Sequence, residues 1–371
     1  MTISALVCLD TSLQVTWADD QLVTQYPWIW LRDHAHDEQT LHPQTQQRQL
    51  YTADVPRDLV ASTAAVVNDL VEIFWDDVTQ PPSRLPVSFL YEFRVAKSAG
   101  AAPPNAKSLW DQPIDTPTVP FDHVMNTESG LEQWLTLVGT FGFCIVVDTP
   151  ATTAASEGLL RRISYVRETI FGAFWQFTAD LTKADTAYTN LELRPHTDGT
   201  YSLDAPGAQM LHCLHFHGTG GDSTIVDGFA LARKLLREHP QHYDTLSRVA
   251  VPGQYIGDGS HLVAARPVLR HDTHGELVQV SFNNYDRAPF LLEQSAMIAF
   301  YDALRAFERL ANDVSRQWRQ VLAPGRALLF DNWRVLHGRA AYTGVRQMCG
   351  GYVNREDMIS RSRLLGNARQ G

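Results

Sequence analysis

The sequence predicts a mainly β protein with covering helices, in which a larger β-sandwich or jelly-roll domain follows a small N-terminal β-rich domain. Two observations predict this class. Many short runs of apolar or β-branched residues lie between Gly, Pro, Asn and Asp clusters, as is typical of strands joined by turns. Only a few segments space apolar residues as amphipathic helices do, and such helices suit the cover of a sheet.

The first 95 residues contain short alternating or apolar segments that are broken by Asp, Gln and Pro clusters, and they predict the N-terminal β-rich domain. Residues 96–118 are rich in Pro, Ala and Ser and are predicted to form a linker. Residues 119–371 are then predicted to form the larger β-sandwich or jelly-roll domain. The N-terminal segments are residues 13–17, 26–31 and 71–75.

In residues 119–371, amphipathic spacing predicts helices and short β-branched runs predict strands. In the last of the helices, Phe300, Leu304, Phe307 and Ala311 form one apolar stripe. Helices are expected at residues 131–142, 158–175, 230–239 and 296–314. Strands are expected at residues 143–148, 210–216, 223–228, 277–284, 326–332 and 347–353.

Composition excludes several classes of protein. The formal charge of −10, without any run of basic residues, argues against a nucleic-acid surface. Only four cysteines occur and none forms a C-x-x-C pair, so neither a disulfide scaffold nor a thiolate zinc site is indicated. The N-terminus does not resemble a signal peptide and no apolar run reaches 18 residues. We therefore expect a cytoplasmic protein that does not bind membranes.

Candidate metal ligands come from two distant segments. His196 and Asp198 are two residues apart, so on a strand both side chains point to the same face. A His-x-Asp pair alone is weak evidence, but His337, beside a glycine in the C-terminal region, supplies a third ligand. Two histidines and one carboxylate leave open coordination positions, as expected for Fe(II) oxygenases. Three further histidines, in the run HCLHFHG at 212–218, are explained more simply by packing or surface positions.

The open positions on such a metal suit 2-oxoglutarate and O2. The distal carboxylate of 2-oxoglutarate requires a planar, two-pronged donor, which a guanidinium provides better than an ammonium. Arg346 is the candidate for this contact, with the hydroxyl of Ser223 beside it.

Six segments carry a resemblance to a known family. Through these segments the chain resembles the γ-butyrobetaine and trimethyllysine dioxygenase branch of the taurine-dioxygenase-like Fe(II)/2-oxoglutarate oxygenases. The runs that begin near residues 282 and 332 are closer to the trimethyllysine members of this branch. The segments are WLRDH (30–34), AYTNLELRPHTDGTY (187–201), TGGDSTIVDGF (219–229), FNNYDRA (282–288), DNWRVLHGR (331–339) and RQMCGGY (346–352).

This resemblance implies a double-stranded β-helix catalytic domain, commonly a homodimer, and a substrate with a trimethylammonium group held in an aromatic cage. The implied cage residues are Phe171, Trp175 and Tyr188, with Asp185 and Tyr352 as further candidates. A quaternary ammonium has no N–H to donate, so π faces and a negative charge must attract it. Phe171 replaces the family's usual tyrosine. Core packing of the rings and a turn cap at Asp185 are the simpler alternatives.

The other end of the substrate has its own candidates. Asn283, Asn284 and Arg287 could hold an anionic group, although an Asn-Asn pair at a strand end is equally ordinary turn chemistry.

The N-terminal domain departs from the family pattern. Members often carry a structural zinc on three cysteines and a distant histidine, but those cysteine positions correspond here to Ala35, Asp37 and Thr40. Histidines do lie nearby, but without thiolates they are better explained as surface residues, and we predict no zinc. They are His34, His36 and His42.

The predicted reaction is hydroxylation of an aliphatic carbon, coupled to conversion of 2-oxoglutarate and O2 to succinate and CO2. Three substrates fit a cage and an anion contact: γ-butyrobetaine, Nε-trimethyllysine and (2-trimethylammonioethyl)phosphonate. Arg194 and Arg287 would suit the phosphonate, whereas Asp185 and the trimethyllysine-like runs favour an amino acid. Two alternatives stay open, which are a dioxygenase of another small acid and a catalytically silent quaternary-ammonium binding protein. The intact ligand set argues against the second alternative.

Overall fold

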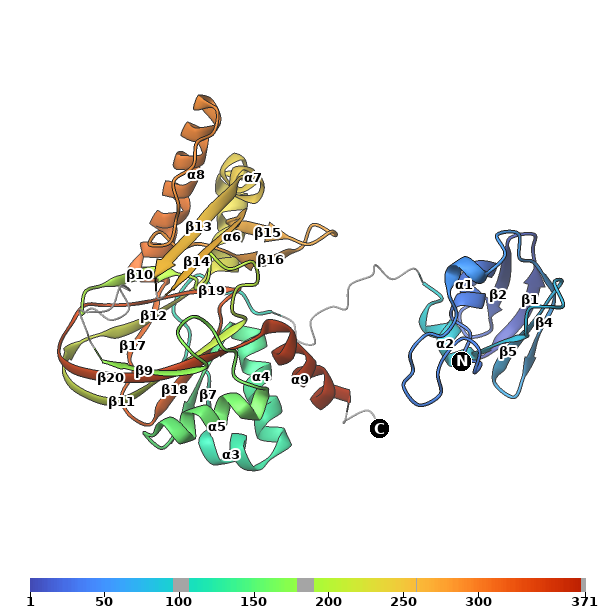
Figure 1. Ribbon diagram of the computed structural model, residues 1–371, viewed down its shortest axis with the longest axis horizontal. Helices are drawn as coiled ribbons and strands as arrows, with labels where there is room; N and C mark the ends of the chain where they lie inside the picture. Colours follow the sequence, from blue (N-terminus) through green and yellow to red (C-terminus); the bar gives the residue numbers. More distant parts are fainter. Residues whose placement is uncertain (96–106, 179–189, 258, 368–371) are drawn as a thin grey trace. The chain divides into compact units, whose positions relative to one another are not determined.

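The computed structural model describes residues 1–95, 107–178, 190–257 and 259–367 (Figure 1). The chain folds into two compact units, Met1–Ala101 and Ala102–Gly371. Each unit has its own hydrophobic core.

The first unit consists of two three-stranded antiparallel sheets that share one core. Every second side chain of a central strand is buried, as for Leu13, Val15 and Trp17, because alternate residues point to opposite faces. A short helix, α1 (Trp28–Asp33), follows the third strand, and α2 (Val87–Glu92) follows the sixth. The strands are β1 (Ile3–Cys8), β2 (Ser12–Trp17), β3 (Val23–Pro27), β4 (Ala61–Val67), β5 (Leu70–Trp75) and β6 (Ser83–Pro86).

The second unit is a jelly roll of two facing sheets. The larger sheet has the order β7-β8-β18-β11-β20-β9 and is antiparallel except for the β7–β8 pair. The smaller sheet has the order β10-β19-β12-β17. The larger sheet comprises β7 (Thr118–Pro120), β8 (Phe143–Val147), β9 (Phe174–Thr178), β11 (Ala208–Gly220), β18 (Arg326–Asp331) and β20 (Tyr342–Val353). The smaller sheet comprises β10 (Leu193–His196), β12 (Asp222–Asp227), β17 (Trp318–Val321) and β19 (Val335–Arg339).

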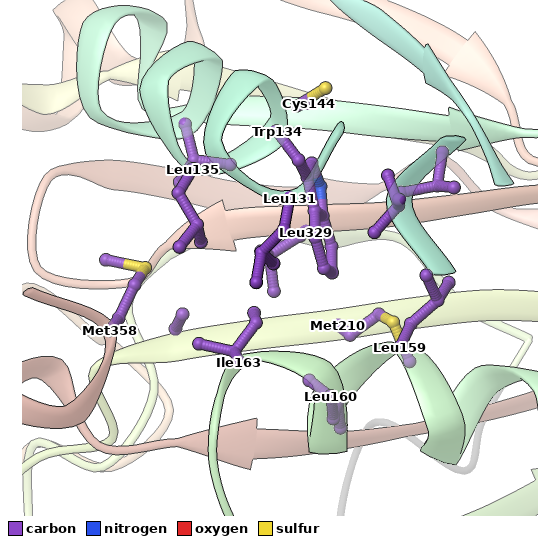
Figure 2. Close-up of a cluster of buried hydrophobic side chains, with 14 of the residues drawn as sticks. Leu131, Trp134, Leu135, Cys144, Leu159, Leu160, Ile163, Met210, Leu329 and Met358 are labelled. Carbon is purple, nitrogen blue, oxygen red and sulfur yellow. The ribbon is translucent and has the colours of Figure 1, made fainter. Parts of the chain in front are cut away.

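Alternation along the strands builds three layers of apolar side chains. In β8, Phe143 and Ile145 point between the two sheets, whereas Cys144 and Val146 point to the opposite face. That opposite face packs under α4 (Glu128–Phe141), α5 (Thr153–Ile163) and α9 (Arg355–Asn367), as Figures 1 and 2 show. Trp134 of α4 is fully buried in this layer.

The outer face of the smaller sheet has its own helical cover. Val226 of β12 and Leu336 of β19 pack with the Phe300, Leu304 and Phe307 stripe of the long helix α8. These helices are α6 (Gly228–Glu238), α7 (Pro240–Arg248) and α8 (Gln294–Asn312). Helix α3 (Phe121–Asn126) precedes α4, and two short strand pairs complete the unit: β13 (Ala250–Gly257) with β14 (Ser260–Pro267), and β15 (Leu269–His271) with β16 (Leu277–Val280).

One ion pair is buried between the strands and helices. The guanidinium of Arg334 lies 2.8 Å from Asp227, and the two side chains are 1% and 0% exposed. Asp227 also accepts hydrogen bonds from the backbone N–H groups of Phe229 and Ala230, so it caps α6. Arg334 donates further to the carbonyls of Ser108 and Thr140, so both charges are satisfied.

Most predicted helices and strands are confirmed, and two segments are wrong. Residues 26–31 are expected to follow the β-rich pattern, but β3 ends at Pro27 and helix α1 begins at Trp28. The helix expected over residues 158–175 ends at Ile163, and Phe174 and Trp175 belong to β9 instead. Trp175 pairs there with Gly350 of β20. Long-range pairing with the sheet therefore overrode the local helical spacing. The expected strand at 277–284 is confirmed only as far as Val280.

Across the described ranges, none of the helices combines the length and the apolar character needed to cross a lipid bilayer.

Candidate metal centre and substrate cavity

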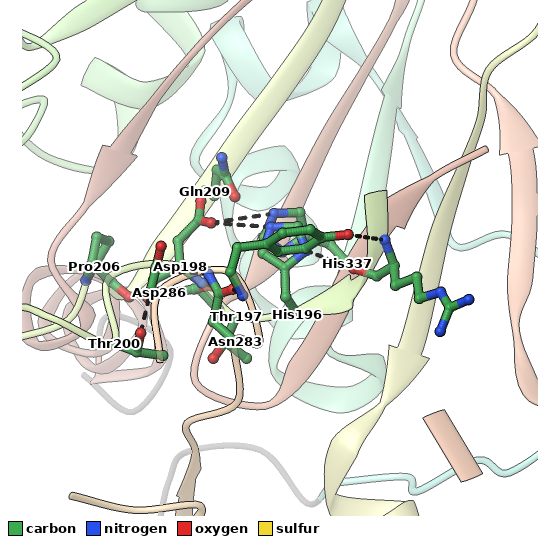
Figure 3. Close-up of polar contacts among 12 residues, drawn as sticks. His196, Thr197, Asp198, Thr200, Pro206, Gln209, Asn283, Asp286 and His337 are labelled. Carbon is green, nitrogen blue, oxygen red and sulfur yellow. Dashed lines mark hydrogen bonds and ion pairs between the residues drawn. The ribbon is translucent and has the colours of Figure 1, made fainter. Parts of the chain in front are cut away.

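The register of two strands brings the candidate ligands together. His196 of β10 lies directly opposite His337 of β19 in the antiparallel pairing. Asp198 follows two residues after His196, and its Oδ1 lies 3.5 Å from Nε2 of His196 and 3.7 Å from Nε2 of His337. Figure 3 shows the three side chains converging from the two segments. All three ligand atoms lie within 4.8 Å of one another.

A close approach of β10 and β19 makes this convergence possible. A Cβ atom placed on Gly338 would come 2.5 Å from the carbonyl oxygen of Leu193. Glycine beside His337 therefore lets the two strands approach at the ligands.

The hydrogen bond of His196 fixes which of its ring nitrogens can bind a metal. Nδ1 lies 2.8 Å from the carbonyl oxygen of Arg194, which can only accept, so Nδ1 carries the proton. The lone pair of Nε2 then faces Asp198 and His337. Such hydrogen bonds to a backbone carbonyl are the usual support of metal-binding histidines. The donor set fits Fe(II).

The charges of the three side chains agree with a metal site. Burial lowers the pKa of His337 to about 3, so this imidazole is neutral and can coordinate. Burial alone would raise the pKa of Asp198, but His337, His196 and the Tyr352 hydroxyl outweigh it and hold this pKa below its usual range. For His196, burial is outweighed by Asp198, which raises its pKa. A metal and a proton therefore compete for Nε2 of His196.

Asp198 is held from two sides. The Tyr352 hydroxyl donates to its Oδ2 at 2.8 Å, which leaves Oδ1 toward the two histidines. Gln209 donates in turn to the Tyr352 oxygen at 3.3 Å. The backbone N–H of Asp198 donates to Oδ1 of Asn332 at 2.8 Å, and the amide of Asn332 donates back to the Asp198 carbonyl at 3.1 Å. Asn332 is 1% exposed, so this clamp is rigid.

A cavity of about 150 Å³, which we call the central cavity, lies against the three ligands. Its walls come from both sheets and from the loops beside them. A second cavity shares Phe171, Asp198, Gly199, Tyr201 and Tyr352 with it, so open space continues past Asp198.

One wall of the central cavity is strongly positive. It holds Arg346 of β20, Arg339 of β19 and Ser223 of β12. Both guanidiniums are buried, at 5% and 7% exposed, and both lie near the Tyr342 ring, 5.8 and 5.0 Å from its centroid. Among the described residues, no partner reaches Nε of Arg346. Burial lowers the pKa of both groups, that of Arg339 to about 10 with help from Arg346, so both stay charged at neutral pH.

Buried charges of one sign require a counter-charge. The wall therefore fits a dianion such as 2-oxoglutarate. Sequence reasoning proposed Arg346 and Ser223 but missed Arg339. Its position two residues after His337 on the same strand was a signal that could have found it.

Aromatic rings line another part of the central cavity. Phe171, Trp175 and Tyr352 all line it, and the Trp175 and Tyr352 rings meet edge to face at 5.9 Å. A Cβ atom on Gly350 would come 2.5 Å from the Trp175 ring, so glycine at this position makes room for the indole. The other two expected cage residues, Asp185 and Tyr188, lie outside the described residues.

Of the three residues expected at the anionic end of the substrate, only one lines the central cavity. Asn283 lines the central cavity, but Asn284 is exposed and does not line it. Arg287 also lies outside the lining and sits over the Tyr301 ring at 5.7 Å. A carboxylate missed by sequence reasoning, Asp286, lines the cavity instead.

The histidines of the first unit do not form a metal group. His34 stacks on Trp30 at 4.6 Å, and His36 packs against Phe89 at 4.8 Å. Within the described residues, the only group of three or more His, Cys, Asp or Glu side chains arranged for a metal is the one at Asp198. That the protein carries no zinc stays a prediction.

Comparisons with known proteins agree across the whole chain. Residues 103–352 match the model of the taurine catabolism dioxygenase TauD, TfdA family, and residues 8–82 match that of the γ-butyrobetaine hydroxylase-like N-terminal domain. The chain is 34% identical to a trimethyllysine dioxygenase of Meyerozyma guilliermondii, over 97% of this chain and 94% of that one. It is 35% identical to the human mitochondrial trimethyllysine dioxygenase, over 93% and 83% of the two chains. It is 32% identical to a γ-butyrobetaine dioxygenase of a Pseudomonas species, over 96% and 94%.

Solved structures agree on the fold. A putative α-ketoglutarate-dependent taurine dioxygenase from Burkholderia xenovorans superposes with a TM-score of 0.50 at 15% identity, covering 67% of this chain and 93% of that one. An asparagine oxygenase solved with Fe(II), hydroxyasparagine and succinate superposes with the same TM-score at 16% identity, over 63% and 83%. By its sequence match over most of its length and by its jelly roll, this chain belongs to the taurine catabolism dioxygenase TauD, TfdA family.

Proposed function

We propose that this protein is an Fe(II)- and 2-oxoglutarate-dependent dioxygenase that hydroxylates an aliphatic carbon of a small trimethylammonium compound, with Nε-trimethyllysine as the first candidate. One observation carries the proposal. A single cavity holds the His–Asp–His group, a wall with two buried arginines and a set of aromatic rings. The names of the relatives, which include trimethyllysine and γ-butyrobetaine dioxygenases, support the choice of substrate.

Each wall of the cavity has a separate task in this proposal. His196, Asp198 and His337 hold Fe(II), which activates O2 for the coupled decarboxylation of 2-oxoglutarate and oxidation of substrate. Arg346 and Ser223, together with Arg339, hold the distal carboxylate of 2-oxoglutarate.

The rings hold the trimethylammonium group. Trp175, Phe171 and Tyr352 line the cavity with aromatic rings, and each cation–π contact to such a ring contributes roughly 0.5–2 kcal/mol. Fixing this end of the substrate places one carbon next to the metal, and positioning of that kind is a main source of rate enhancement.

A cytoplasmic location and a homodimeric state belong to the proposal as well. Several animal relatives are named mitochondrial, so fractionation of the native cell is the test of location. Light scattering of the purified chain tests the dimer.

The function is tested by succinate release. The purified chain is loaded anaerobically with Fe(II), supplied with 2-oxoglutarate and O2, and given trimethyllysine, γ-butyrobetaine, (2-trimethylammonioethyl)phosphonate or unmethylated lysine. We expect succinate and one hydroxylated product in equal amounts with trimethyllysine, and none above background with lysine. If lysine is turned over as fast as trimethyllysine, the enzyme does not require a trimethylammonium group. If the iron-loaded protein is inactive with all four compounds, a binding function is favoured.

A further inference from the structure

We infer that Asp286 is the receptor for a second cationic group of the substrate, a protonated amine, so that the enzyme selects a trimethylammonium compound that is also an α-amino acid. This inference rests on the proposed function and adds the residue that separates one candidate substrate from the others.

Asp286 is a carboxylate held in place at the cavity wall. Its Oδ2 accepts hydrogen bonds from the amide of Asn283 at 2.8 Å and from the hydroxyl of Thr200 at 3.3 Å. Figure 3 shows these contacts beside the metal ligands. The backbone carbonyl of Asp286 accepts from the N–H of Gln254 at 2.8 Å, which ties the loop to β13. The side chain therefore has a fixed position.

The loop that carries Asp286 lies next to the metal centre. Tyr285, the preceding residue, places its ring 5.7 Å from the ring of His196, edge to face. Its hydroxyl accepts a hydrogen bond from the backbone N–H of Arg194 at 3.0 Å. Asp286 and the three metal ligands therefore line the same cavity.

The distribution of charge around the cavity gives Asp286 its role. The described arginines in the lining are Arg339 and Arg346, and both lie on the wall assigned to 2-oxoglutarate. Arg194 is exposed, and Arg287 does not line the cavity. Because the described substrate side presents a carboxylate, it repels a dianionic phosphonate and attracts a cation.

The chemistry of the two cationic groups assigns them to different walls. A trimethylammonium group has no N–H and gains most from aromatic faces, whereas a primary ammonium has three donors that a carboxylate satisfies. Trimethyllysine carries both groups, but γ-butyrobetaine carries only the first. Asp286 therefore favours the amino acid.

The first test needs no variant. The iron-loaded wild-type enzyme is given trimethyllysine and 6-(trimethylammonio)hexanoate, which is the same molecule without its α-amine. A charged hydrogen bond of ordinary strength predicts that kcat/KM for trimethyllysine exceeds that of the analogue by about tenfold to a hundredfold. Equal values of kcat/KM for the two compounds would overturn the inference while leaving the proposed function intact. If neither compound supports succinate release, the proposed function fails and the inference with it.

The second test locates the effect at Asp286. In Asp286→Asn the shape is kept and the charge is removed, and Asp244→Asn, at an exposed ion pair on α7, is the matched control. We expect Asp286→Asn to lose the preference for trimethyllysine by about tenfold or more and to turn over the analogue within about threefold of wild type. Equal losses with both compounds would show that Asp286 acts on the shared trimethylammonium end or on the fold, and would refute the inference.

Discussion

Replacing Tyr352 by phenylalanine separates two roles of this residue. The ring that lines the cavity is kept, whereas the hydroxyl that donates to Oδ2 of Asp198 at 2.8 Å is lost. A hydrogen bond to a charged group contributes about 1.5–3 kcal/mol, which corresponds to about tenfold to a hundredfold in an equilibrium constant. Loss of a residue that orients a metal ligand has an effect of the same size. We therefore expect the affinity for Fe(II) to fall by about this factor.

The assay is anaerobic titration calorimetry with Fe(II), with Tyr243→Phe as the control. The Tyr243 hydroxyl also makes a hydrogen bond, to His271 at 2.7 Å, but it lies away from the cavity. At saturating Fe(II), the KM for trimethyllysine should change little in Tyr352→Phe. Unchanged metal affinity together with a large rise in this KM would show that Tyr352 serves the substrate alone.

The cavity and the core yield three further predictions, and a fourth concerns pH. Trp175→Leu should raise the KM for trimethyllysine about tenfold because it removes one aromatic face from the cavity, and steady-state kinetics with an unchanged KM would refute this. Arg346→Met should raise the KM for 2-oxoglutarate by about tenfold or more while sparing Fe(II) affinity, measured by calorimetry; an equal loss of both would indicate a disturbed fold. Arg334→Met leaves the buried carboxylate of Asp227 without its ion-pair partner and should lower the free energy of unfolding by about 3–5 kcal/mol in urea titrations. A loss under about 1 kcal/mol would show that this ion pair does not stabilise the fold. Burial lowers the pKa of His212 to about 4. As the pH falls, the unfolded chain is therefore protonated at this histidine before the folded chain is, and the free energy of unfolding should decrease between about pH 6.5 and 4. In His212→Asn, the free energy of unfolding measured in urea should depend less on pH over this range. If the pH dependence is unchanged, other groups cause it.

The strands that are covered on both faces were the most predictable from sequence. Residues 143–147 and 327–330 are continuous apolar runs because one set of side chains packs between the sheets and the other under the helices. The segment before Trp175 was predicted as helix because its local spacing is helical, whereas its strand forms only through pairing with Gly350. Pairing partners of that kind lie far apart in sequence and leave no local signal.

The candidate site was partly predictable for a similar reason. The spacing of His196 and Asp198 predicts that both share a strand face, but this was weak evidence until His337 and the family resemblance were added. The register that places His337 opposite His196 is a property of the folded sheet. Asp286 lies in a run whose Asn and Arg residues drew attention to anion binding, and only the orientation of the loop shows that the carboxylate faces the cavity.

The two buried guanidiniums of Arg339 and Arg346 affect more than the recognition of a ligand. A dianion that binds beside them interacts with the folded chain alone, so binding and folding are thermodynamically linked. Dicarboxylates should therefore raise the melting temperature even in metal-free protein, in proportion to the logarithm of their concentration once it exceeds Kd. Succinate has the same two charges as 2-oxoglutarate, so the product can bind the same wall and compete with the next molecule of 2-oxoglutarate. The turnover rate should then respond to the ratio of 2-oxoglutarate to succinate in the surrounding solution.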